Sequence, residues 1–286
     1  MILSYHPCFE ADKNLLCAGR EPGVDDLAAI RTADAVILPQ GCCRALYKMA
    51  RSNCQHVFPN FDARFNHRGK IGQIELFQKH HVFYPKTEFF RDSRGFAERY
   101  RDFPEKPIFD FPFVFKFDWG GDGDLVYQVR STDHFADVLK AAREFENSGQ
   151  KGFIIQEYIP ADNRSLRVVV VGELFFSYWR IQHHVHHFLS NVSKDATIDY
   201  DLYPHMQESA VESVKEFCRL TKINLAGFDI LFSSIAEAKR PLFLEINYYF
   251  GRRGLGGSET FYDLLNKEIM KWLESLGLAL EKRTLN

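Results

Sequence analysis

Leu225-Ala-Gly-Phe-Asp229-Ile-Leu-Phe, followed by Pro241-Leu-Phe-Leu-Glu245-Ile-Asn247, is the stretch that decides the fold of this chain. Side chains alternate between the two faces of a strand, so Glu245 and Asn247 share one face while the apolar residues on either side of Glu245 fill the other. If the strand of Asp229 pairs alongside, two carboxylates and an amide oxygen converge. These hard donors suit magnesium that holds a nucleotide phosphate. An isolated Glu-x-Asn is far more often the wet face of an ordinary strand, so the interpretation depends on the rest of the chain.

A lysine in an apolar strand precedes a glycine-rich turn, in Phe113-Val-Phe-Lys116-Phe and Asp118-Trp-Gly120-Gly121-Asp-Gly123-Asp. An unpaired ammonium between two phenylalanines is costly, so Lys116 should have an anionic partner. The three glycines let backbone amides approach and cradle phosphate oxygens. Taken alone, the same pattern is typical of a snorkelling lysine before a hairpin turn.

A predicted hairpin carries two arginines. Gly172-Glu173 is a plausible two-residue loop, and pairing the residues that flank it places Arg167 opposite Tyr178, with Arg180 as a diagonal neighbour on the same face. Two guanidiniums side by side repel, so their proximity indicates a clamp for an anion such as a γ-phosphate or an acyl phosphate. The alternative is two solvated arginines on an exposed face.

Composition limits the class of protein. The 286 residues are 45% hydrophobic and 15% aromatic, enough to fill the cores of two or three small domains. With 36 basic and 38 acidic residues, the chain lacks the basic footprint of a nucleic-acid binder. The six cysteines show no Cys-x-x-Cys spacing, which favours reduced thiols in a cytosol. No run of about 18 apolar residues predicts a membrane span, so we expect a cytoplasmic protein.

The first 66 residues alternate between strand and helix patterns, which predicts a small parallel α/β domain with its boundary in the polar stretch 60–68. Its expected elements are strands at 1–5, 35–39 and 56–59 and helices at 25–32 and 44–52. Beyond the boundary we expect a helix at 70–80, a strand at 82–90, a loop at 91–112, strands at 113–117, 125–129 and 153–159, and helices around 133–147, 206–217 and 261–276.

The chain resembles the ATP-grasp superfamily over about residues 67 to 277. The resemblance rests on the order and spacing of its motifs: the lysine strand, the glycine loop, the segment Gln156-Glu157-Tyr158-Ile159, the arginine hairpin, Asp229 and the Glu-x-Asn of the last strand. They look most like the branch of ribosomal-protein glutamate ligases, glutathione synthetases and D-alanine:D-alanine ligases. The resemblance implies an ATP-grasp fold of the α/β (α+β) class, in which lobes 67–152 and 153–286 clasp ATP. It also implies an ATP- and magnesium-dependent ligase that activates a carboxylate as an acyl phosphate for attack by an amine. A carboxylate or small-molecule kinase on the same fold and a catalytically silent nucleotide-binding module are the alternatives.

The resemblance assigns a role to each matching residue. For the cofactor, ATP, these are the phosphate lysines Lys70 and Lys116, the glycines Gly120, Gly121 and Gly123, the adenine and ribose segment Gln156, Glu157, Tyr158 and Ile159, and Asn191. Arg167 and Arg180 look like the catalytic clamps. Asp229, Glu245 and Asn247 look like the magnesium ligands, for two ions by analogy, with manganese as an alternative.

The loop after the metal strand offers Arg252 and Arg253, which could grip a substrate carboxylate, although a flexible basic loop fits equally well. The expected partners are the acid and amine substrates, as small molecules or peptides, with a homodimer as one option for assembly. The cluster His183-His184-Val-His186-His187 has no carboxylate or cysteine at ligand spacing, so substrate contact or a wet loop is favoured over a transition-metal site.

Several positions depart from the family pattern. Asp122 and Asp124 place negative charge in the phosphate loop, and Leu125 stands in place of its last glycine. Phe117 stands where a proline usually follows the lysine. Ser165 replaces an aspartate, so ribose recognition is expected to fall to Asp162. The tail Gly251-Arg252-Arg253-Gly254 lacks the usual Ser-Pro-Gly turn, which suggests an unusual acceptor.

Overall fold

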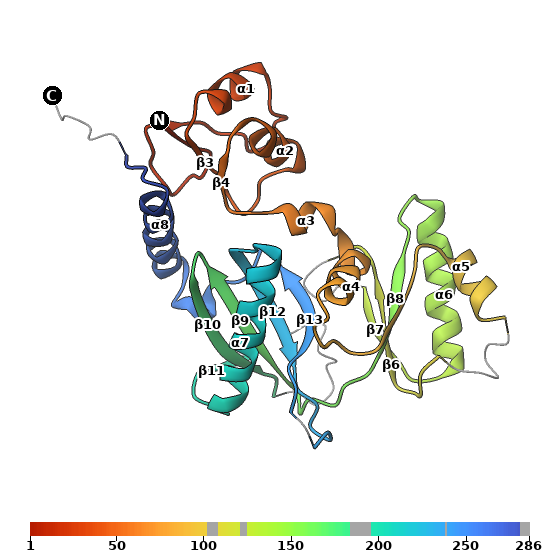
Figure 1. Ribbon diagram of the computed structural model, residues 1–286. Helices are drawn as coiled ribbons and strands as arrows, with labels where there is room; N and C mark the ends of the chain where they lie inside the picture. Colours follow the sequence, from red (N-terminus) through yellow and green to blue (C-terminus); the bar gives the residue numbers. More distant parts are fainter. Residues whose placement is uncertain (102–107, 121–124, 184–195, 238, 281–286) are drawn as a thin grey trace.

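The structure is a computed structural model that describes residues 1–101, 108–120, 125–183, 196–237 and 239–280. Its elements form three sheets. One is parallel and contains the first strands of the chain, and the other two are antiparallel. Figure 1 shows the N-terminal unit above two lobes that lie side by side. The predicted α/β (α+β) class is confirmed.

The N-terminal unit is a four-stranded parallel sheet in the order β2-β1-β3-β4. Its elements are β1 (Ile2–Ser4), β2 (Lys13–Asn14), α1 (Val24–Arg31), β3 (Ala35–Ile37), α2 (Arg44–Asn53) and β4 (His56–Phe58). All three predicted strands and both predicted helices are present. The two-residue strand β2 is too short to leave a periodic pattern, and the sequence did not predict it.

The central lobe is an antiparallel sheet in the order β5-β8-β6-β7, covered by α6. The elements from the boundary onward are α3 (Asp62–Asn66), α4 (Gly69–Lys79), β5 (Thr87–Phe90), α5 (Ser93–Arg99), β6 (Phe113–Phe117), β7 (Val126–Val129), α6 (Thr132–Asn147) and β8 (Phe153–Glu157). Phenylalanines from the sheet and α6 form the core of this lobe.

Two expectations for this region are wrong. The strand expected at 82–90 is confined to Thr87–Phe90, because Pro85 lacks the N–H that a strand ladder requires. The loop expected at 91–112 contains helix α5. The side chain of Asp92 caps that helix by accepting the N–H of Gly95 at 2.8 Å, so a short polar residue marks a helix start that the weak apolar pattern concealed.

The C-terminal lobe is an antiparallel sheet in the order β11-β10-β9-β12-β13. Its elements are β9 (Arg164–Val171), β10 (Leu174–Ile181), β11 (Thr197–Asp199), α7 (Pro204–Thr221), β12 (Leu225–Leu231), β13 (Leu242–Asn247), the 3-10 turn η2 (Arg253–Leu255) and α8 (Ser258–Ser275). Helix α7 lies over one face of this sheet (Figure 1), and α8 packs through Phe261, Leu265 and Ile269 with residues of the opposite face.

The register of the C-terminal sheet confirms the hairpin pairing that the sequence predicted, and it meets the condition set for the metal site, that the strand of Asp229 pairs alongside. Arg167 lies opposite Tyr178 in β9 and β10, and Asp229 lies opposite Glu245 in β12 and β13. One detail differs, because the register shifts between Asp229 and Ile230, where Ile230 pairs with Phe243 and leaves Leu244 as an extra residue. The core therefore receives Phe243 together with Ile246, where the alternation had predicted Leu244.

Helix α8 also holds the tip of the β9–β10 hairpin. Glu268 is 2% exposed, and its carboxylate accepts the N–H of Glu173 at 3.0 Å and Lys271 Nζ at 2.6 Å. Gly172 has a φ of +61°, and a Cβ at this position would lie 2.6 Å from Glu268 Oε2. Only glycine satisfies both the backbone angle and the close contact.

Candidate active site

Asp229 is the centre of the candidate site. It lies opposite Arg167 in the neighbouring strand β9, and both residues are 7% exposed. Arg167 donates from Nε to Asp229 Oδ1 at 2.5 Å and from Nη2 to Oδ2 at 3.1 Å, which is a bidentate ion pair. Burial would raise the pKa of Asp229, but Arg167 and Arg180 outweigh burial and hold that pKa below its ordinary value. Asp229 is therefore a buried anion in this structure.

Arg180 completes the arginine pair that the hairpin predicts. Its Nη2 donates to Asp229 Oδ1 at 2.7 Å and to Ser165 Oγ at 2.9 Å. Its Nε is buried without a hydrogen-bond partner in the part of the chain that the structure describes. Burial, together with Arg167, lowers the pKa of Arg180, although Asp229 opposes this shift. The two guanidiniums thus share a face, as predicted, and the carboxylate between them reduces their repulsion.

Lys116 extends from β6 of the other lobe. It is 8% exposed, and its Nζ donates to Gln156 Oε1 at 2.8 Å, while Gln156 Nε2 donates to Thr87 Oγ1 at 2.8 Å. Burial lowers the pKa of Lys116 to about 8, and the nearby charge of Glu245 works against this decrease. Glu245, in the opposite sheet, acts on Lys116 through its charge alone, and Lys116 forms no ion pair among the described residues.

Lys70 lies at the start of α4, as predicted, and is 9% exposed. Its Nζ donates to the carbonyl oxygen of Gly120 at 3.2 Å, so one hydrogen bond joins the two predicted phosphate elements. The N–H of Ile71 donates to Asp118 Oδ1 at 2.7 Å. Asp118 therefore binds the first turn of α4, where a helix favours negative charge.

Glu245 and Asn247 lie on the same face as Asp229. Burial raises the pKa of Glu245, with Lys70 and Lys116 opposing the shift. Asn247 Nδ2 donates to Asp229 Oδ2 at 3.1 Å, which leaves the side-chain oxygen of Asn247 available to coordinate a metal ion. The structure therefore brings together the three residues that the sequence proposed as magnesium ligands.

The chemistry of this donor set fits magnesium, because all three residues offer hard oxygens. Asp229 already accepts four hydrogen bonds, which fill the lone pairs of a carboxylate, so a metal ion must displace one donor from it. Glu245 accepts no hydrogen bond within the described residues, and is the more accessible ligand. No group of three or more His, Cys, Asp or Glu in those ranges could hold a metal ion, so Asn247 is needed as the third donor. The magnesium site stays a prediction.

The segment predicted to read adenine and ribose begins in β8, where Gln156 is 1% exposed. Glu157 ends this strand and accepts the N–H of Lys86 at 2.6 Å, while Tyr158 and Ile159 follow half-buried. Asp162, predicted for the ribose, has a φ of +48° and forms an ion pair with Arg164 at 2.6 Å. Gln156 bonds to Lys116 of the charged cluster, and the roles of these residues toward adenine and ribose remain predictions.

Arg252 and Arg253, predicted to grip substrate, point to different neighbours. The Arg252 guanidinium lies 4.9 Å from the ring centre of Phe261 and 4.4 Å from that of Tyr262, both in α8. Arg253 Nη2 donates to the carbonyl oxygen of Ala196. The loop itself approaches the arginine hairpin, since a Cβ on Gly254 would lie 2.1 Å from the ring of Tyr178. Substrate contact by these arginines stays a prediction.

Several predicted features lie outside the described residues: Gly121 and Gly123, the aspartates Asp122 and Asp124, Asn191, and all of the histidine cluster except His183. His183 Nε2 lies 2.7 Å from Thr197 Oγ1. Leu125, which follows the predicted phosphate loop, has a φ of +61°. This left-handed backbone suits the glycine that the family pattern places there, and it strains leucine.

Sequence reasoning did not assign three residues that the structure connects to the site. Ser165 and Thr87 accept hydrogen bonds from Arg180 and Gln156, respectively, and Gln73 bonds to the backbone of the metal strand. Gln73 follows Lys70 by three residues in one helix, which places both side chains on the same side of α4. That spacing was the one signal available, and it required knowing what α4 packs against.

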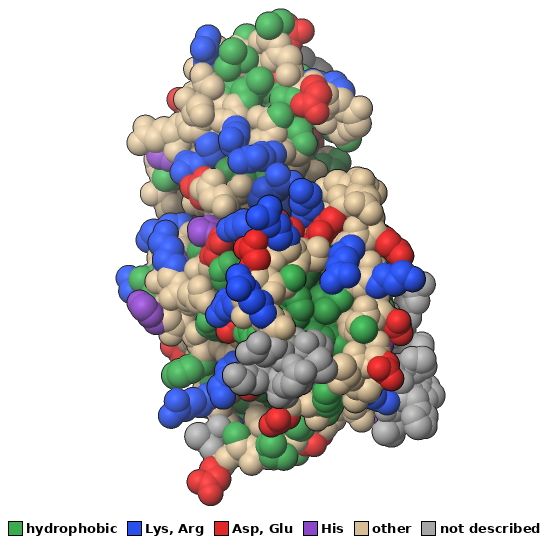
Figure 2. Space-filling model, turned by 90° about the vertical axis from the view of Figure 1, so that its right-hand side faces the viewer, with side chains coloured by type: hydrophobic (Ala, Val, Ile, Leu, Met, Phe, Trp, Pro, Cys, Tyr) green, Lys and Arg blue, Asp and Glu red, His purple; other side chains and the backbone are tan. Residues whose placement is uncertain are grey.

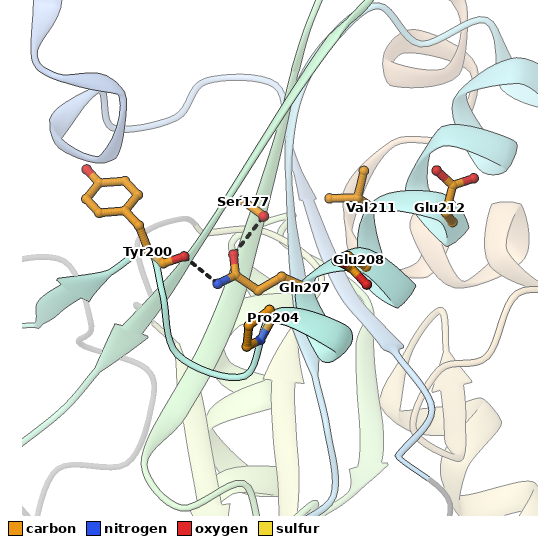
Figure 3. Close-up of a pocket in the computed structure, with 7 residues that line it drawn as sticks. All are labelled: Ser177, Tyr200, Pro204, Gln207, Glu208, Val211 and Glu212. Atoms are coloured by element: carbon orange, nitrogen blue, oxygen red, sulfur yellow. Dashed lines mark hydrogen bonds between the residues drawn. The ribbon is translucent and has the colours of Figure 1, made fainter.

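A separate pocket of about 320 Å³ lies between β10, β11 and α7, lined by Ser177, Tyr200, Pro204, Gln207, Glu208, Val211 and Glu212. Figure 3 shows Gln207 bridging Ser177 and the backbone of Tyr200. Ser177 and Tyr178 are successive residues of one strand, so this pocket opens on the sheet face opposite to Arg167 and Asp229. It is not part of the charged cluster.

Basic side chains also gather on the surface. Figure 2 shows Lys and Arg side chains across the middle of one face, with a few acidic side chains among them. The formal net charge of the chain is −2, so this face is more positively charged than the molecule as a whole. Such a local excess attracts anions even where the net charge does not. In the described residues, no helix is long and apolar enough to cross a membrane.

Three solved structures show the same architecture. An ADP complex of N5-carboxyaminoimidazole ribonucleotide synthetase has a TM-score of 0.64 at 12% identity and covers 97% of this chain and 70% of that one. A RimK domain protein ATP-grasp from Sphaerobacter thermophilus gives 0.63 at 12% identity, with 93% and 98% covered. D-alanine–D-alanine ligase from Bacillus anthracis gives 0.62 at 13% identity, with 93% and 88% covered. At these identities the likeness concerns the fold, which is the ATP-grasp fold.

The family follows from the sequence itself. The model of the RimK-like ATP-grasp domain matches residues 67–273, and the chain belongs to that family. The ATP-grasp resemblance that the motifs indicated is thereby confirmed. No protein of curated function matches the sequence.

Proposed function

We propose that this protein is an ATP- and magnesium-dependent carboxylate–amine ligase that forms a C–N bond and releases ADP. The observation that carries the proposal is a buried excess of positive charge. Among the described residues, Lys70, Lys116, Arg167 and Arg180 lie near three carboxylates, those of Asp118, Asp229 and Glu245, so the basic side chains outnumber the acidic ones. Buried charges are normally paired, and an excess of positive charge favours an anionic ligand such as a nucleotide phosphate.

The residues divide the chemistry between the two lobes. Lys70 and Lys116 hold the phosphates of ATP, and Arg180 presents its buried, unpartnered Nε toward the transferring group. A carboxylate oxygen of the acid attacks the γ-phosphorus and ADP leaves, after which the amine nitrogen attacks the acyl carbon and phosphate leaves. Arg167 and Arg180 stabilise the negative charge that develops in both steps. Bound magnesium would neutralise phosphate charge at Asp229, Glu245 and Asn247. Positioning and electrostatics supply most of the catalysis, so no covalent enzyme intermediate is required.

The proposal is tested by measuring ADP release with a panel of small acids and peptides, in the presence of hydroxylamine as a surrogate amine. The expected result is ADP formation that depends on the acid and on magnesium, together with an equimolar hydroxamate. A matched reaction with Lys116→Ala controls for contaminating ATPases, and it should lose most of the activity.

Two other outcomes would replace the proposal. ADP release with a stable phosphorylated acid that resists every amine would identify a kinase. Tight binding of Mg-ATP without turnover over a broad acid and amine panel would identify a silent nucleotide-binding module.

A further inference from the structure

The outer edge of β13, the strand that carries the predicted metal ligands Glu245 and Asn247, forms hydrogen bonds with the side chain of Gln73 and with the backbone of Phe83. Among the described residues, β13 is the last strand of its sheet, and one side of its backbone has no neighbouring strand there. The amide of Gln73, in α4, fills this position: its Nε2 donates to the carbonyl oxygen of Ile246 at 3.0 Å, and its Oε1 accepts the N–H of Ile246 at 2.8 Å. A neighbouring strand would make the same pair of bonds.

The residue that Gln73 holds is the one between two predicted ligands, Glu245 and Asn247. A primary amide with both bonds made fixes the height and the tilt of the peptide at Ile246, and so fixes the directions of the side chains on either side. Elsewhere on this edge, the N–H of Phe243 donates to the carbonyl oxygen of Phe83 at 2.8 Å, a backbone contact that needs no particular side chain. The specific contact is made only at Ile246 among the described residues of this edge.

Helix α4 thereby connects the two halves of the site. Lys70 lies one turn before Gln73 and reaches Gly120, beside the predicted phosphate loop. The same lysine lies close enough to Glu245 to oppose the burial-induced rise of its pKa. The helix that presents the phosphate lysine also holds the strand that presents the metal ligands.

We propose that Gln73 is a positioning residue that aligns Glu245 and Asn247 for a magnesium ion bound with nucleotide. The inference rests on the proposed function, since it concerns the metal that the ligase would use. A role limited to covering a strand edge predicts a different result, because it would lower the stability of the fold without changing the coupling between metal and nucleotide.

The test compares Gln73→Met with Gln78→Met. Gln78 is an exposed glutamine of the same helix without a recorded side-chain hydrogen bond, and methionine keeps the length and the helix propensity of glutamine. Calorimetry would measure ATP affinity with and without magnesium, and the ratio of the two affinities reports the metal site. Gln73→Met should reduce this ratio by about tenfold or more, as the loss of a partner that orients metal ligands typically does. Gln78→Met should keep the wild-type ratio.

Hydrogen exchange of the Ile246 amide in the nucleotide-free protein provides the second readout. Exchange at Ile246 should be faster in Gln73→Met than in Gln78→Met, which confirms that the contact exists in solution, while unchanged protection of the other amides of this sheet shows that the variant is folded. The inference would be overturned if Gln73→Met kept the wild-type ratio of ATP affinities with and without magnesium, or if the exchange rate at Ile246 were unchanged. Either result would leave the proposed ligase function standing. If the wild-type protein itself shows no magnesium effect, the proposed function fails, and the role of Gln73 fails with it.

Discussion

Two buried aspartates, Asp26 in the N-terminal unit and Asp229 in the C-terminal sheet, form ion pairs with arginine in different surroundings. Asp26 is 2% exposed and accepts bonds from Arg20 at 2.6 and 2.8 Å, from Tyr5 Oη at 3.0 Å and from the N–H of Gly23 at 2.7 Å. Arg20 reaches solvent with 45% of its side chain exposed. One carboxylate is thus paired with one guanidinium, and the guanidinium is partly exposed to solvent.

Asp229, in contrast, pairs with two arginines, and both are largely buried, with side-chain exposures of 9% and 18%. Two lysines, Lys70 and Lys116, and two further carboxylates, Glu245 and Asp118, lie nearby among the described residues. The comparison teaches that an ion pair by itself does not mark a functional site. A balanced pair at the start of α1 stabilises a loop, whereas the cluster around Asp229 contains more basic than acidic side chains among the described residues, which favours an anionic ligand.

The largest expected effect separates the arginines of the two clusters. Arg180→Ala should reduce the rate of acid-dependent ADP release by roughly 10²- to 10³-fold, because it removes a preorganised cation from the transferring group. ATP affinity should change much less. Arg20→Ala should lower the melting temperature and leave the rate per folded molecule near that of the wild type. Steady-state kinetics and thermal unfolding of both variants check this, and equal losses of rate in the two variants would end the distinction.

The second prediction concerns the aspartates themselves. Asp26→Asn should destabilise the fold by about 1–2 kcal/mol, because charged hydrogen bonds become neutral ones while an acceptor oxygen is kept. Saturating Mg-ATP should raise the melting temperature of Asp26→Asn by the same increment as that of the wild type, since binding stabilises only through the site. In Asp229→Asn, the magnesium-dependent part of that increment should disappear. Retention of the full magnesium effect in Asp229→Asn would remove Asp229 from the metal site.

The pH dependence of ATP affinity sharpens the role of Lys116. Its pKa is lowered to about 8 by burial, so the lysine is charged below pH 8 and loses its charge as the pH rises through that value. Affinity should therefore fall above pH 8, by at most about tenfold per pH unit for a single proton. Lys116→Arg stays charged and should flatten the profile between pH 7 and 9.5. Identical profiles for both proteins would show that Lys116 does not hold phosphate as a cation.

The smallest effect lies beside the predicted phosphate loop. Leu125→Gly should relieve the left-handed backbone and raise the free energy of unfolding by up to about 1 kcal/mol, the strain being partly offset by the greater freedom of glycine in the unfolded chain. Denaturant unfolding measures this. Gly149→Ala, at a φ of +90° on the surface, is the reverse substitution and should destabilise. A loss of stability in Leu125→Gly would mean that the packing of leucine outweighs its backbone strain.

Local periodicity predicted the parts of the site that are close in sequence. The two-residue turn fixed the register that places Arg167 opposite Tyr178, and strand alternation placed Glu245 and Asn247 on one face. Such features depend on the geometry of single strands and turns, which the sequence carries directly.

Contacts between distant segments were beyond the same reasoning. Gln73 and Ile246 are 173 positions apart, and no periodic pattern specifies which strand edge a helix side chain will reach. The bulge at Leu244 results from pairing with β12, and the sequence has no glycine at this position that would predict a bulge. Asp229 bonds to both arginines because the strands β9, β10 and β12 lie side by side. The sequence therefore indicated a bound anion for the arginine pair, but it did not indicate that Asp229 is an anionic partner within the protein.

The anchored hairpin tip at Gly172 has a practical consequence for engineering. Two-residue turns on a surface are usual places for inserting tags or opening a chain to make a circular permutant. Here Glu268 lies against the turn and accepts the N–H of Glu173, so a longer loop would lose that bond and push α8 away from the sheet. Because the same hairpin carries Arg167, five residues before Gly172, and Arg180, seven residues after Glu173, an insertion at its tip would disturb the arginine pair. The tip behaves as part of the scaffold of the site, and fusion partners are better attached elsewhere.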